Sequence, residues 1–197
     1  ENLVQVQKTE SQALDQIDQV IGLGSDQVAC ILLEPIQAEG GDNHFRPEFH
    51  RELRRICDDN EMLLVYDEVQ TGLGATGKMW AFEHYVQPDL LAFGKKTQVC
   101  GMLAGPRIDE VPDNVFAVPG RIDSTWSGSL VDMVRCKHYL EVFEQDNLVE
   151  HSRRMGEVLL DELEGLVQEF PAVSNARGRG LFCAFDLPDC GYRDRLR

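Results

Sequence analysis

Two charged residues, Asp67 and Lys95, follow apolar segments that have the composition of buried strands. A lysine amine can form a Schiff base with an aldehyde, and a carboxylate can keep a ring nitrogen protonated so that the ring withdraws electrons from a reacting carbon. By itself, an aspartate and a lysine at strand ends are more often a solvated pair. The pair therefore indicates this chemistry only if the surrounding elements and motifs support it.

The elements that must position these charges alternate along the chain. Short apolar runs predict buried parallel strands at 28–34, 62–66 and 90–93. Helical segments precede or separate them, at 10–22, from Pro47 through Cys57, and around 80–85. This alternation predicts an α/β sheet, in which ligands bind beyond the carboxyl ends of the strands. Glu34, Asp67 and Lys95 all fall there, although the proline after Glu34 favours a turn role for that residue.

The second half of the chain changes character. Helices are predicted over 128–143 and 147–170, followed by a strand-like segment at 180–185. This pattern predicts two domains: residues 1–146 as part of a large domain and 147–197 as the start of a smaller, truncated α/β domain. The chain begins without Met and stops where another helix would start, so we expect a fragment of a longer protein.

The composition excludes several classes of partner. A formal net charge of -15 repels nucleic acid and anionic membranes, and no apolar stretch reaches the roughly 20 residues of a membrane span. The six cysteines form no CxxC pair and no metal-ligand spacing with the histidines. We therefore expect reduced, mostly buried cysteines in a cytoplasmic protein and no metal site.

A longer motif surrounds the two charges. The run Asp-Glu-Val-Gln-Thr-Gly at 67–72, with Pro88-Asp89 and the segment to Lys95, resembles the signature of the class III aminotransferases, which use pyridoxal 5'-phosphate (PLP). The resemblance extends through 34–41 upstream and 177–180 downstream, and so covers nearly the whole chain. It implies a PLP-dependent transferase of the aspartate aminotransferase type I fold, with part of the large sheet domain and part of the small C-terminal domain.

Within that family, segment 93–101 is most similar to the L-lysine 6-aminotransferases. This implies transfer of the terminal amino group of L-lysine to 2-oxoglutarate by a ping-pong mechanism, giving 2-aminoadipate 6-semialdehyde and L-glutamate. The 4-aminobutyrate aminotransferases share the double lysine and remain the alternative. A truncated relative that serves only as a structural module is a third possibility.

The resemblance also implies roles for individual residues. Asp67 would pair with the pyridine nitrogen, Val69 would pack on the ring and Gln70 would hydrogen-bond its hydroxyl group. Lys95 would carry the cofactor and act as general base. Thr125 resembles the residue that reaches the cofactor phosphate of the neighbouring subunit, which implies a homodimer; a helix-preceding cap is the structural alternative.

Two further expectations concern the substrate and the second lysine. Arg177 resembles the arginine that binds the substrate carboxylate, and Glu39 the switch carboxylate that occupies that arginine or the space beside it. Lys96 is a rival to Lys95, but Lys95 lies six residues after Asp89, as in family members with the double lysine.

The family's N-terminal part contributes the phosphate-binding turn, a ring-stacking aromatic and a second substrate arginine, none of which this sequence contains. We therefore expect the full-length parent to be active and this chain alone to be inactive.

Overall fold

The computed structural model describes residues 3–24, 27–122 and 128–196. The first part contains these helices and strands: α1 (Leu3–Gly22), β1 (Cys30–Leu33), β2 (Ile36–Gln37), β3 (Asn43–His44), α2 (Pro47–Asp59), β4 (Leu63–Asp67), η2 (Ala81–His84), β5 (Leu90–Phe93), η3 (Lys95–Thr97), β6 (Gly101–Ala104) and η4 (Pro106–Glu110). The second part contains α3 (Leu130–Gln145), α4 (Leu148–Glu169), β7 (Ser174–Arg179), β8 (Phe182–Asp186) and α5 (Cys190–Leu196). The mixed α/β class is therefore as predicted.

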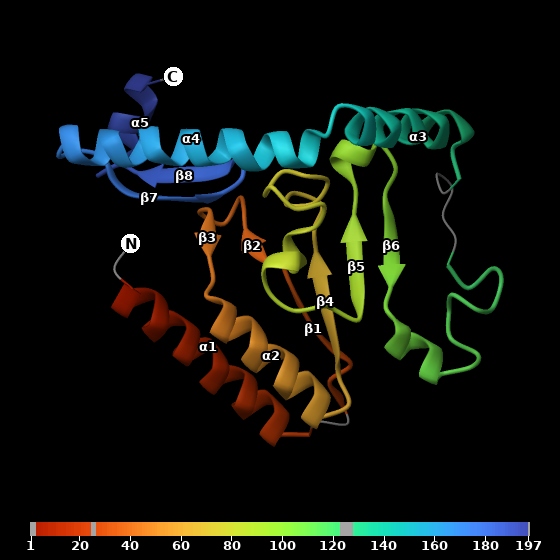
Figure 1. Cartoon of the computed structure of the whole chain (residues 1–197). Coiled ribbons are helices and arrows are strands. Elements are labelled where there is room, and N and C mark those ends of the chain that lie inside the picture. Colours follow the sequence, from red (N-terminus) through yellow and green to blue (C-terminus); the bar gives the residue numbers. More distant parts are fainter. Residues whose placement is uncertain (1–2, 25–26, 123–127, 197) are drawn as a thin grey trace.

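A four-stranded sheet in the order β1-β4-β5-β6 forms the centre of the molecule. The three predicted strands are parallel to one another, and β6, which the sequence pattern did not reveal, pairs antiparallel with β5. Asp67 lies opposite Ala92 in the register of β4 and β5. In Figure 1 the carboxyl ends of the parallel strands point toward α3 and α4.

Helix α2 places its apolar face in the core. Pro47 stands in its first turn, where the missing N–H costs nothing, and the residues predicted from the helical period are buried: Phe49, Leu53, Ile56 and Cys57. They pack with Met62, Leu64 and Tyr66, and partly buried side chains of α1 cover the cluster. The helical period alone therefore predicted which face of α2 packs against the core.

The burial predicted for the first strand is wrong in this chain. Strand β1 pairs with β4 only, and Leu32 is 65% exposed. Its apolar composition is typical of a strand in a parallel sheet. Within the described residues, however, only one edge of β1 has a partner strand. The prediction of buried cysteines is right only for Cys57, since Cys30, Cys100 and Cys190 are exposed.

The C-terminal elements differ in detail from the prediction. The strand expected at 180–185 is present as β8, but the sequence pattern did not reveal its antiparallel partner β7; Gly180, with a φ of 55°, turns the chain between the two strands. Helix α4 covers this hairpin through Gly156, where an added Cβ would lie 2.1 Å from the Gly180 backbone. Much of the apolar stripe expected over 147–170 is exposed, with Met155 at 39% and Phe170, the residue after α4, at 46%.

Among the described residues, no helix combines the length and apolar character needed to cross a membrane. The six cysteines are all free thiols.

Candidate functional site

The three predicted charges lie at one edge of the sheet. Glu34 directly follows β1, Asp67 is the last residue of β4, and Lys95 comes after β5 with Gly94 between. Because β1, β4 and β5 are parallel, their carboxyl ends share this edge. The expected grouping of Glu34, Asp67 and Lys95 at one sheet edge is therefore confirmed as a matter of topology.

The turn after β4 (residues 67–72, here the aspartate turn) lies against the turn after β5 (residues 94–98, the lysine turn). The Glu68 N–H donates to the Ala92 carbonyl at 2.9 Å, which extends the pairing of the strands beyond Asp67. A Cβ added at Gly94 would lie 3.6 Å from Val69 Cγ2, so the Val69 side chain packs directly on the lysine turn. The sheet register thus continues into contacts between the two turns.

The backbone distinguishes the two adjacent lysines. Lys95 has a φ of 51°, a left-handed conformation that is costly for a residue with a side chain. Gln98 fixes this conformation, because its backbone N–H and its side-chain Nε2 both donate to the Lys95 carbonyl, at 2.9 and 3.0 Å. Lys95 is exposed, and within the described part of the chain its Nζ makes no hydrogen bond or salt bridge.

Lys96 has a different environment. Its Nζ donates to the Gln70 carbonyl across the two turns, and its side chain is half-buried. Burial, together with the positive charge of Lys95, lowers the pKa of Lys96. The lysine with a free amine is therefore Lys95, while Lys96 is engaged with the backbone.

Asp67 keeps part of its carboxylate available. Its Oδ1 accepts from the Val69 N–H at 3.0 Å, and Oδ2 accepts no hydrogen bond from the described residues. Its neighbour Glu68 is 1% exposed and accepts from Ala81 N, Phe82 N and the Thr71 hydroxyl. Burial raises the pKa of Glu68. One carboxylate of the aspartate turn therefore anchors η2, and the other remains free to bind a cation or a protonated nitrogen.

Glu34 takes the turn role that its following proline suggested. Its Oε2 accepts from the Ala38 N–H at 3.0 Å and so ties the end of β1 to the start of the turn between β2 and β3.

The structure brings Arg177 to the turn that carries Glu39, but not to the Glu39 carboxylate. Arg177 Nη2 donates to the Gly41 carbonyl and Nε to the Asp42 carbonyl, at 2.9 and 2.8 Å. Its Nη1 pairs with Asp186 at 2.9 Å. Glu39 is exposed. In this conformation Arg177 joins the β2–β3 turn to the β7–β8 hairpin, and its predicted role toward a substrate stays a prediction.

Thr125 lies outside the described residues, so its predicted phosphate contact has no structural counterpart here.

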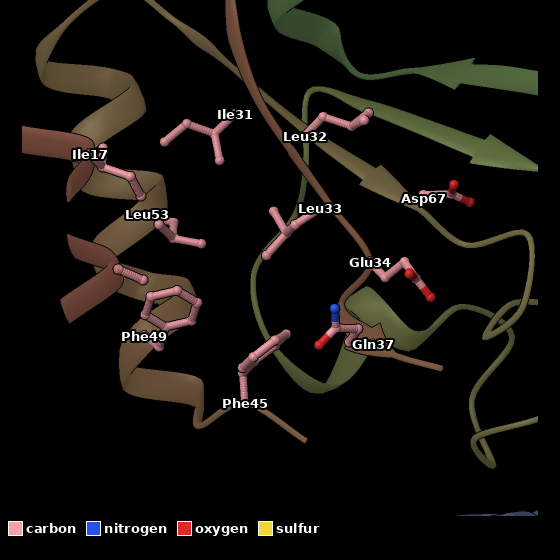
Figure 2. Close-up of a pocket in the computed structure, with 11 residues that line it drawn as sticks. Ile17, Ile31, Leu32, Leu33, Glu34, Gln37, Phe45, Phe49, Leu53 and Asp67 are labelled. Carbon is pink, nitrogen blue, oxygen red and sulfur yellow. The ribbon is translucent and has the colours of Figure 1, made fainter. Parts of the chain in front are cut away.

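A hollow of the surface lies away from Lys95. It has a volume of about 600 Å³ and lies between α1, α2 and β1, lined mainly by apolar side chains, with Glu34, Gln37 and Asp67 among its polar ones. Figure 2 shows the Asp67 and Glu34 carboxylates at one side of it, apart from Phe45, Phe49 and Leu53. Gln70 and Lys95 do not line this hollow, so it is not a ready-made cofactor pocket within the described residues.

Two contributors to the site were not identified from the sequence: the Lys96–Gln70 contact and the Glu68 anchor. Both depend on which backbone groups the turns leave unpaired, and residue types do not reveal this. The only indication of these two contacts in the sequence is that each charged residue is doubled: Glu68 stands beside Asp67, and Lys96 beside Lys95.

Comparison with known proteins identifies the relatives of this arrangement. The family model described as aminotransferase class-III matches residues 1–195. The L-lysine-epsilon aminotransferase of Mycobacterium tuberculosis is 52% identical over 189 residues, which are 95% of this chain and 42% of that protein. A 4-aminobutyrate aminotransferase of Emericella nidulans is 39% identical over 186 residues, 91% of this chain and 36% of that protein.

A solved structure shares the fold. The lysine aminotransferase from M. tuberculosis in the internal aldimine form superposes with a TM-score of 0.92 at 52% identity, covering 95% of this chain and 43% of that chain. This chain thus spans less than half the length of the relatives it matches.

Proposed function

Because this chain belongs to the class-III aminotransferases, which are PLP-dependent, we propose that its whole protein is an L-lysine 6-aminotransferase. It would transfer the terminal amino group of L-lysine to 2-oxoglutarate, giving 2-aminoadipate 6-semialdehyde and L-glutamate by a ping-pong mechanism. The higher identity to an L-lysine-epsilon aminotransferase, 52% against 39% for the 4-aminobutyrate relative, supports this donor.

The observation that carries the proposal is the contact between the aspartate turn and the lysine turn. It sets a carboxylate with a free oxygen, Asp67, and a lysine with a free amine, Lys95, at one sheet edge. This donor set fits PLP, which needs a lysine for its aldehyde and a carboxylate for its ring nitrogen. When bound, PLP supplies a ring that withdraws electrons from the carbon bearing the amino group.

The residues of the chain would divide the remaining work. Asp67 would hold the ring nitrogen protonated, Val69 would pack on the ring, and Gln70 would orient it through its amide. The Lys95 amine, once released from the cofactor, would take a proton from the substrate carbon and return it one position along. Its fixed backbone limits the positions that the amine can reach, which favours transfer between two defined atoms.

The proposal also includes roles for Thr125, Arg177 and Glu39, a domain division and a cellular location. Thr125 would contact the cofactor phosphate of a neighbouring subunit, so the whole protein would be a homodimer. Arg177 and Glu39 would bind and release the substrate carboxylate, which requires Arg177 to leave the carbonyls of Gly41 and Asp42. The division at residues 146 and 147 falls where α3 ends and α4 begins. The six free thiols support a cytoplasmic location.

The alternative donor is 4-aminobutyrate, as in the more distant relatives. The proposal is tested by incubating the whole protein with 2-oxoglutarate and each amine, and measuring glutamate. We expect L-lysine to react faster than 4-aminobutyrate or ornithine; the reverse order would replace the proposed donor.

The cofactor assignment has its own test. Borohydride reduction after addition of PLP should attach the cofactor to Lys95, and Lys95→Ala should lower activity by on the order of 10³-fold or more. Labelling of Lys96 instead would contradict the assignment. In the same experiment we expect residues 1–197 alone to retain no PLP and to be inactive.

A further inference from the structure

We propose that Lys96 is a positioning residue of the Lys95 site. Its ammonium group holds the aspartate turn against the lysine turn and places a second cation beside the Lys95 amine. The inference rests on the proposed function and adds a residue that does not touch the reacting atoms.

The first support is the contact itself. Lys96 Nζ donates to the Gln70 carbonyl, and no other side-chain hydrogen bond joins the two turns within the described residues. Val69 also packs on Gly94 of the lysine turn, and the Glu68 N–H donates to the Ala92 carbonyl of β5. Gln70 lies three residues after Asp67, so a fixed Gln70 carbonyl limits the movement of the whole aspartate turn relative to Lys95.

The second support is the cost of this arrangement. A half-buried ammonium group loses part of its hydration, and a hydrogen bond to one carbonyl replaces it only in part. Burial and the adjacent Lys95 both lower the pKa of Lys96, and only the Glu68 carboxylate opposes them. A side chain held against its preferred charge state at the edge of a candidate site is typical of a functional position.

The surrounding charges define what Lys96 does electrostatically. Lys95 on its own turn and Glu68 on the aspartate turn act on it directly. From α3, Arg135 Nη1 donates to the Gln98 side chain at 3.2 Å, which brings another cation to the lysine turn. Because like charges repel, a cation at Lys96 should act on any charge that forms at the Lys95 nitrogen, and a pH titration of the cofactor bound there measures that effect.

The experiment uses the whole protein with PLP and three variants. Lys96→Met removes both the donor and the charge at similar length, Lys96→Arg keeps both, and Lys8→Met removes one charge from an exposed site on α1 as the matched control. The first readout is the pH titration of the visible absorbance band of the cofactor bound to Lys95. The second is the dissociation constant for PLP.

We expect Lys96→Met to move the titration midpoint up by about 0.5 to 1 pH unit, because the neighbouring cation is gone. We expect it also to weaken PLP binding by about fivefold, because a bound group needs both turns in place. Lys96→Arg and Lys8→Met should leave both values near those of the unchanged protein. If Lys96→Met does not fold, Lys96→Gln takes its place in the titration.

A Lys96→Met protein that unfolds more easily but keeps the midpoint and the PLP affinity would overturn the inference, because Lys96 would then be purely structural. Failure of the proposed function looks different. In that case the unchanged protein itself would show no borohydride-trapped PLP at Lys95.

Discussion

The two ends of the central sheet treat their charged residues in opposite ways. At the amino end, Asp89 precedes β5 and is 6% exposed; it accepts from Arg54 Nη1 and from the Leu64 N–H, each at 2.8 Å. Arg107 lies 3.6 Å from the same carboxylate. At the carboxyl end, Asp67 accepts one hydrogen bond from its own turn, and the Lys95 amine has no partner among the described residues.

The pKa shifts follow the same division. Burial lowers the pKa of Arg54, but the hydrogen bond and charge of Asp89, together with Asp58, outweigh it and raise the pKa overall. At the carboxyl end, burial raises the pKa of Glu68 and lowers that of Lys96, so both shifts oppose the charged forms. The amino end therefore gains stability from its charges, whereas the carboxyl end gives up stability and keeps reactive groups free.

The largest effect that this contrast predicts is on folding. Replacing Asp89 by Ala should lower the free energy of unfolding by about 3 kcal/mol, because it leaves Arg54 and the Leu64 N–H without their acceptor. Asp67→Ala should cost less than about 1 kcal/mol while abolishing transamination. Urea unfolding of the cofactor-free whole protein measures both changes. Asp113→Ala, at a carboxylate that is 80% exposed and outside this cluster, is the control. Equal losses at Asp89 and Asp67 would remove the contrast between the two ends.

Arg177 can also be tested by comparing its effect on stability with its effect on activity. It has several hydrogen-bond partners in the structure, although the family resemblance implies that it binds substrate. Arg177→Met should lower the free energy of unfolding by about 2 kcal/mol, because charged hydrogen bonds to Gly41, Asp42 and Asp186 are lost. Arg193→Met should have almost no effect, because among the described residues this arginine pairs with its neighbour Asp194 alone. Urea unfolding and the KM for 2-oxoglutarate separate the two roles. A raised KM with unchanged stability would support substrate binding instead.

The contrast also shows what the sequence could and could not predict. Strands with a strong apolar signal, such as β4 and β5, were found, and their ends correctly grouped Asp67 and Lys95. Strands β2, β3, β6 and β7 were missed, because β2 and β3 have only two residues each and β6 and β7 lack a continuous run of large apolar residues. The Lys96–Gln70 contact and the partners of Arg177 were missed as well, because they use backbone carbonyls that only the folded turns expose.

Backbone strain at the carboxyl end gives a smaller prediction. Lys95 has a φ of 51°, which glycine adopts freely and alanine does not. Lys95→Gly should therefore be more stable than Lys95→Ala by about 1 kcal/mol, although both should be inactive. At Lys96, which has no positive φ, the order of the Gly and Ala variants should be reversed. Thermal unfolding of the four variants tests this; the same order at both positions would show that Lys95 is not held in a strained conformation.

The smallest expected effect is the pH dependence of stability at the carboxyl end. The pKa of Lys96 is lowered from 10.5 in the folded protein, so the folded state loses this proton before the unfolded state does. Between the two pKa values the unfolded state binds more protons, and stability from this group must rise with pH. We therefore expect the difference in unfolding free energy between the unchanged protein and Lys96→Met to increase slightly as the pH approaches 10.5.

Urea midpoints measured across this range test the direction, with Lys137→Met as the control at a 71% exposed side chain. Arg54 at the amino end should contribute no slope in this range, because its pKa is raised further above it. A difference that stays constant or falls would show that burial does not oppose the charge of Lys96, and the carboxyl end would then not differ from the amino end in this respect.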